Sequence, residues 1–72
     1  MKIEIKAEVA GSVFQIEAKV GAEMRKGDVI MLLESMKMEV PVVAPAAGRL
    51  TEILVAEEDA IVRGQVVASI ES

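Results

Sequence analysis

Hydrophobic and polar residues alternate along two stretches near the start of the chain, residues 2–9 and residues 14–20. A period of two predicts β-strands that bury one face and expose the other. In the first stretch, the residues expected to face the interior are Ile3, Ile5, Ala7 and Val9. In the second stretch, they are Phe14, Ile16, Ala18 and Val20.

Short apolar runs at residues 28–35 and 65–72 predict two more strands, because each follows a turn sequence that contains glycine. Another strand is expected at residues 38–44, where Pro41 suits the edge of a sheet. Residues 21–27 could form a helical turn, but the matching segment in the second half contains β-branched residues, which favour a short strand and a turn. No stretch combines a helical period with caps at both ends, so the sequence predicts an all-β fold.

The second half of the chain repeats the first. Residues 7–35 align without a gap with residues 44–72, at an offset of 37 positions. Eight of the 29 aligned pairs are identical, whereas composition alone would give roughly two or three. The identical pairs are Ala7/Ala44, Ala10/Ala47, Gly11/Gly48, Ile16/Ile53, Gly27/Gly64, Val29/Val66, Glu34/Glu71 and Ser35/Ser72. Two similar β halves that cannot bury their apolar faces alone predict two small sheets, packed face to face about a pseudo-twofold axis.

A lysine flanked by two methionines, Met36-Lys37-Met38, lies between the two repeats. The first repeat ends at Ser35, which places Met36 and Lys37 as the two central residues of a tight hairpin. Neither is Gly or Asn, so we expect a type I turn rather than a primed turn. Lys37 would then point into water and could be no more than a solvated turn residue. Two methionines on an exposed tip are hard to explain as core residues, and they suit contacts with another protein.

The length and composition limit the possible partners. Seventy-two residues make a single domain, residues 1–72. The absence of cysteine fits a reducing, cytoplasmic setting and excludes a thiolate metal site, so no metal is expected. A net charge of −4 and a single aromatic residue, Phe14, argue against a nucleic-acid partner. The apolar runs are far shorter than the roughly 20 residues of a membrane span, so no membrane partner is expected.

The residue types that are missing argue against an enzyme. Without histidine or cysteine, the chain has no Ser-His or Cys-His nucleophile, and its isolated glycines form no phosphate loop. The acidic run Glu57-Glu58-Asp59 is interpreted as a solvated turn rather than an acid/base pair. A lysine that forms Schiff bases is buried, unlike a lysine at a hairpin tip. No catalytic residue is therefore expected in this chain.

The sequence around Lys37 resembles the biotin attachment segment of biotin carboxyl carrier proteins, within the biotin/lipoyl attachment domain family. The similar segment is LLESMKMEVPVVAPAAGRLTEI, and the turn sequences in the rest of the chain match as well. The resemblance implies a flattened β-barrel, or barrel-sandwich hybrid, of two four-stranded antiparallel sheets with the modified lysine at a hairpin tip. It also implies structural roles for the turn glycines Gly11, Gly27, Gly48 and Gly64.

By this resemblance, Lys37 is the acceptor of biotin, held as an amide on the lysine amine. Met36 and Met38 would be read by a biotin protein ligase and by the partner enzymes. Their flanking residues are Glu34, Ser35 and Glu39. The implied partners are that ligase, a biotin carboxylase and a carboxyltransferase, and biotin would carry the carboxyl group between the last two. The chain would be the carrier of a biotin-dependent carboxylase or decarboxylase, such as an acetyl-CoA carboxylase.

Two other functions stay open. A lipoyl carrier has the same fold and lysine position, although its tip usually has an acid before the lysine and alanine after it. An unmodified barrel-sandwich module, like those in efflux adaptors, would need no lysine. The chain also departs from the carrier pattern at four positions, Ala10, Ala22, Ser35 and Glu58. Its short loop between the second and third strands leaves no room for the thumb of some acetyl-CoA carboxylase carriers, so the parent enzyme stays open.

Overall fold

Eight β-strands and no helix make up the computed structural model, which describes residues 1–72. The strands are β1 (Lys2–Lys6), β2 (Gly11–Ile16), β3 (Glu23–Met24), β4 (Val29–Ser35), β5 (Met38–Val43), β6 (Gly48–Ile53), β7 (Ala60–Ile61) and β8 (Val66–Glu71). They form two four-stranded sheets with the orders β1-β8-β6-β3 and β5-β4-β2-β7, and all pairs are antiparallel. The prediction of an all-β fold with two four-stranded sheets is confirmed. Because the chain forms no helix, none of its segments is a candidate for a membrane-spanning helix.

The two sheets are related by the sequence repeat. An offset of 37 residues carries β1–β4 onto β5–β8 and converts the strand order of one sheet into that of the other. Hydrogen bonds repeat with the same offset: the Gly27 N–H donates to the Ala44 carbonyl, and the Gly64 N–H donates to the Ala7 carbonyl, both at 2.8 Å. Both glycines have φ near +90°, a conformation that favours glycine. The predicted pseudo-twofold arrangement is therefore confirmed down to single turns.

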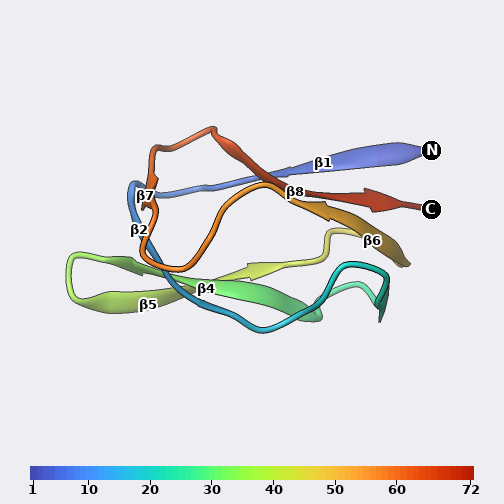
Figure 1. Cartoon of the computed structure of the whole chain (residues 1–72), viewed down its shortest axis with the longest axis horizontal. Helices are drawn as coiled ribbons and strands as arrows, with labels where there is room; N and C mark the ends of the chain where they lie inside the picture. Colours follow the sequence, from blue (N-terminus) through green and yellow to red (C-terminus); the bar gives the residue numbers. More distant parts are fainter.

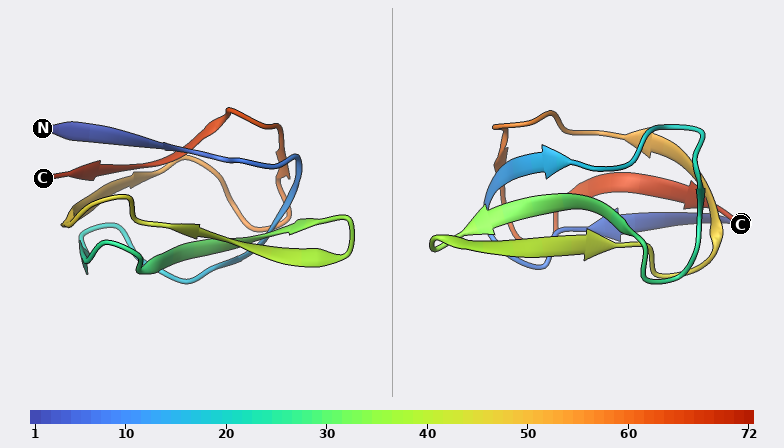
Figure 2. Two further views of the ribbon diagram at one scale, coloured as in Figure 1. Left: turned by 180° about the vertical axis from the view of Figure 1, so that it is seen from behind. Right: turned by 90° about the horizontal axis from the view of Figure 1, so that it is seen from below.

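The core lies between the two stacked sheets, which Figures 1 and 2 show as two layers. It consists of 14 buried apolar residues contributed by both halves of the chain. They are Ile5, Ala7, Val13, Met24, Ile30, Met31, Leu33, Val42, Ala44, Leu50, Ile61, Val67, Ala68 and Ile70. Of the four residues expected to face inward from the first alternating stretch, two are in this core and two are half-buried. That stretch is confirmed as a strand, although β1 already ends at Lys6.

The prediction for the second alternating stretch is partly wrong. Ile16 and Ala18 do pack against the core, but Phe14 is 47% exposed and Val20 is 59% exposed. In β2, Val13 pairs with Leu33 of β4 and the next pair skips over Phe14, which is the extra residue of a β-bulge. A bulge shifts the alternation by one residue, so Val13 takes the inward position that the pattern assigned to Phe14.

Val20 is exposed for a different reason. The Ala22 N–H donates to the Lys19 carbonyl at 3.0 Å, which makes Val20 and Gly21 the centre of a turn. Gly21 has a φ of +97° there. The chain leaves β2 at Ile16 and has already turned away from the sheet when it reaches Val20, so the alternating pattern no longer applies.

Gly11 and Gly48 begin β2 and β6 where a neighbouring strand passes very close. A Cβ atom on Gly11 would collide with the backbone oxygen of Glu34, near the end of β4. On Gly48, it would meet the Ile70 side chain and the backbone oxygen of Glu71. The two glycines are repeat partners, and at Gly11 the start of β2 lies close against the end of β4 that leads to the Met36-Lys37 turn.

We expect Gly11→Ala to lower the free energy of unfolding by about 1–3 kcal/mol, because a backbone oxygen cannot move aside as a side chain can. Gly48→Ala should have a comparable cost, because its Cβ would meet the backbone oxygen of Glu71 and a γ-methyl of the fully buried, β-branched Ile70. Urea unfolding followed by circular dichroism measures both changes. The exposed neighbour Ala10 provides the control: Ala10→Ser should change the free energy by no more than about 0.5 kcal/mol. A Gly11→Ala variant as stable as this control would contradict the close-approach argument.

Candidate functional site: the tip of the β4–β5 hairpin

Lys37 lies at the tip of the hairpin formed by β4 and β5. The two strands pair from Val29 opposite Val43 up to Ser35 opposite Met38, which leaves only Met36 and Lys37 outside the ladder. Figures 1 and 2 show the hairpin extending beyond the body of the molecule at the end opposite the two termini. The prediction that Met36 and Lys37 are the central residues of a two-residue hairpin is confirmed.

The turn type differs from the prediction. Met36 has a φ of 52° and Lys37 a φ of 65°, and left-handed values at both central residues define a type I′ turn rather than a type I turn. The twist of a type I′ turn matches the right-handed twist of the flanking strands, whereas a type I turn would splay them. The geometry of a two-residue loop therefore outweighs the preference of Met and Lys for negative φ. Each left-handed residue costs roughly 1–2 kcal/mol, so the tip is locally strained.

The Lys37 side chain has no partner within the molecule. It is exposed, and it takes part in none of the side-chain hydrogen bonds or ion pairs. The predicted exposure of this lysine is confirmed. A primary amine that is exposed in this way can be reached from several directions by a second protein, and no neighbouring carboxylate has to be displaced first.

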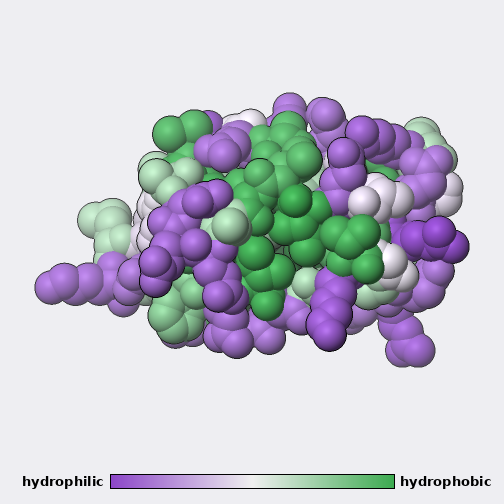
Figure 3. Space-filling model, viewed as in Figure 1, coloured by the Kyte–Doolittle hydropathy of each residue, from purple (hydrophilic) through white to green (hydrophobic).

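Both methionines beside Lys37 are also exposed, Met36 at 92% and Met38 at 65%. In contrast, Met24 and Met31 belong to the core. At the left end of Figure 3, where the hairpin of Figure 1 ends, pale green apolar atoms lie beside purple hydrophilic ones. The tip therefore combines a cation with two flexible apolar side chains that contribute nothing to the core.

Behind the tip, the last rungs of the ladder bring the other predicted site residues together. Glu34 pairs with Glu39, and Ser35 pairs with Met38. The two carboxylates are both exposed and lie directly opposite each other, an arrangement of like charges that destabilises a β-ladder. Ser35 is half-buried. All six residues singled out from the sequence thus lie within two rungs of the turn.

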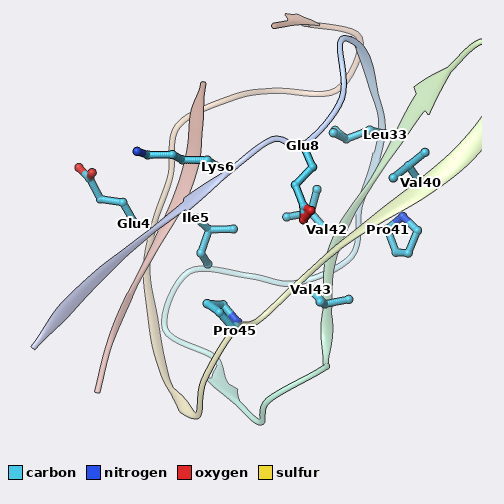
Figure 4. A pocket seen from close by; sticks show the side chains of 10 residues that line it. All are labelled: Glu4, Ile5, Lys6, Glu8, Leu33, Val40, Pro41, Val42, Val43 and Pro45. Atoms are coloured by element: carbon cyan, nitrogen blue, oxygen red, sulfur yellow. The ribbon is translucent and has the colours of Figure 1, made fainter. Parts of the chain in front are cut away.

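The surface has two hollows, and neither includes the tip. One, of about 320 Å³, lies between the edge strands β1 and β5, and its lining includes Ile5, Glu8, Val40 and Pro41. Figure 4 shows the Glu4 and Lys6 side chains at its rim, pointing away from β5. The other lies beside Gly48 and Arg49, near the C-terminal Ser72. Sequence reasoning missed the first hollow, because it depends on how the edges of the two sheets meet. The tip itself exposes the Lys37 amine and has no enclosed binding site.

Comparison with known proteins gives consistent matches. The family described as "Biotin-requiring enzyme" matches residues 4–70. A biotinylated protein TB7.3 homolog of Mycobacterium leprae is 41% identical over 70 residues, which are 97% of this chain and 99% of that protein. A biotin/lipoyl attachment protein of Bacillus subtilis is 36% identical over 62 residues, 86% of this chain and 85% of that protein. The crystal structure of Kluyveromyces lactis urea carboxylase matches with a TM-score of 0.95 and 30% identity, over 99% of this chain and 6% of the carboxylase.

A small β-sandwich that presents one lysine on a projecting hairpin, and that recurs within a large carboxylase, is a carrier domain rather than a catalytic one. Specifically, it is a biotin carboxyl carrier domain of the kind found in biotin-dependent carboxylases. The chain belongs to the biotin-requiring enzyme family, whose match spans nearly its whole length.

Replacing Met36-Lys37 by Asn-Gly should raise the free energy of unfolding by about 1 kcal/mol, because Asn and Gly adopt left-handed φ at little cost. Replacing Lys37 by Val should lower it, since a β-branched residue tolerates positive φ poorly. Chemical denaturation of both variants tests the turn assignment, with Lys37→Arg as the neutral control. A loss of stability in the Asn-Gly variant would show that the turn is not type I′.

Proposed function

We propose that Lys37 is the residue to which biotin is attached, and that the chain carries carboxybiotin between a biotin carboxylase site and a carboxyltransferase site. The observation that carries the proposal is the unpaired, exposed Lys37 amine on a two-residue turn at the projecting end of the molecule. The match to the biotin-requiring enzyme family and the name of the mycobacterial relative, a biotinylated protein, support the choice of biotin.

The tip is well suited to amide formation with a carboxylic acid. In this reaction, the Lys37 nitrogen bonds to the biotin carboxyl carbon and loses a proton. The carboxyl C–O bond breaks, and its oxygen leaves on a phosphoryl group from the ATP that a biotin protein ligase consumes. The product has no positive charge and ends in a long flexible arm. Bound biotin would supply the carboxyl-transfer chemistry, while the protein supplies presentation and docking. Tethering keeps the carboxyl donor at high effective concentration near both enzyme sites.

Met36 and Met38 are proposed as the residues that the ligase and the two enzyme sites recognise. Their thioethers are free of the core and can adapt to differently shaped pockets. Glu34, Ser35 and Glu39 are proposed as the polar border of this contact. The opposed carboxylates are unfavourable for the isolated hairpin, which fits residues kept for a partner rather than for stability.

A lipoyl carrier is the second candidate, because the Bacillus subtilis relative is named for either cofactor. Methionines on both sides of Lys37 favour biotin over lipoate. The third function, an unmodified structural module, would not explain why the methionines are exposed or why the turn is strained. The parent enzyme and its substrate are not specified by the carrier, and the cytoplasmic location expected from the sequence stays a prediction.

Co-expression with a biotin protein ligase should add one biotinyl group to the chain, as measured by intact mass and streptavidin binding. Lys37→Arg should remove the adduct completely, because guanidinium does not form this amide. Lys26→Arg is the matched control: this lysine is also exposed in a turn, yet its loss should leave the adduct in place. A lipoyl-sized adduct from the host would favour the second candidate. A chain that stays unmodified when the biotin protein ligase and a lipoyl ligase are both active would refute both carriers.

A further inference from the structure

Five methionines are the only sulfur-containing residues in this chain. It contains no cysteine, tryptophan, tyrosine or histidine, so oxidants find few other reactive side chains. Methionine oxidises to the sulfoxide, a polar and chiral group that no longer suits an apolar contact. Which methionines a peroxide can reach therefore decides what oxidation does to this protein.

The fold divides the methionines into two groups. Met31 is fully buried and Met24 is 6% exposed, so the packed core shields both sulfur atoms from solvent. Met36 and Met38 are 92% and 65% exposed and have no aromatic ring nearby in the hairpin to cover them. Met1 is exposed as well, but it lies with the termini at the other end of the molecule.

We infer that Met36 and Met38 form an oxidation-sensitive site, at which conversion to methionine sulfoxide blocks docking of the tip without unfolding the domain. The consequence for docking rests on the proposed function of Lys37, whereas the modification itself does not. Both sulfurs flank the acceptor lysine, one on each side, so oxidation of either places a polar S=O group within the proposed contact. The core loses nothing, because neither side chain belongs to it.

The reaction balances with hydrogen peroxide as the oxidant. The thioether sulfur attacks one peroxide oxygen, the O–O bond breaks, and the other oxygen leaves as water. Sulfur is oxidised by two electrons, and the peroxide is reduced by two. A methionine sulfoxide reductase can reverse the change, and each sulfoxide epimer needs its own class of reductase. The site can thus be switched off and restored while Lys37 remains chemically intact.

The test begins with the unbiotinylated protein in mild hydrogen peroxide. Peptide mass spectrometry should find sulfoxide at Met36 and Met38 at least about ten times faster than at Met24 or Met31. Circular dichroism should stay unchanged. The initial rate of biotinylation by the ligase should then fall about tenfold, and treatment with both classes of reductase should restore it.

The double variant Met36→Leu/Met38→Leu is the control for the peroxide treatment. Whatever its own rate of biotinylation, that rate should not change after exposure to peroxide, although Met1 is still oxidised. Equal oxidation of core and tip methionines would overturn the inference, as would an unchanged rate in protein with both tip sulfoxides. If the untreated chain accepts no biotin, the proposed function fails, while the mass spectrometry still decides whether the oxidation site exists.

Discussion

Each half of the chain supplies the two central strands of one sheet and the two edge strands of the other, and the rest of the structure depends on this interlocking. In one sheet, β4 and β2 come from the first half, and they are flanked by β5 and β7 of the second half. In the other sheet, the roles of the two halves are reversed. Neither half completes a sheet or a core alone, and the chain crosses from one half to the other through the two-residue turn between β4 and β5.

The same repeat relates the two ends of the molecule. The repeat partner of the Ser35–Met38 rung is the pair formed by Ser72 and Met1, which exchange backbone hydrogen bonds at 2.9 Å and lie at the opposite end of the molecule. At the junction between the halves, the two-residue turn closes the hairpin and places Lys37 beyond the ladder.

Much of the fold can be predicted from the sequence, because each turn or strand pattern occurs in both halves of the chain. Gly27 and Gly64 mark equivalent turns, and either alone would have been weak evidence. The errors arise where tertiary geometry overrides local preference. Phe14 occupies a bulge that no residue type signals, and its repeat partner Thr51 is skipped in the same way where β6 pairs with β8. Met36 and Lys37 adopt left-handed conformations because a two-residue hairpin requires them, although neither residue favours them. The position of the tip was predictable, while its backbone conformation was not.

The strain at the tip and the exposure of its side chains have a common physical origin. A residue in the core contributes to stability by burying apolar surface, but Met36, Lys37 and Met38 bury little, and two of them hold unfavourable φ angles. The rungs of the β4–β5 ladder behind them must hold the turn in place. The body of the domain thus stabilises a tip that would not be stable by itself. Such an arrangement suits a group that must enter several enzyme sites in one fixed orientation, because the binding partner does not have to order the turn.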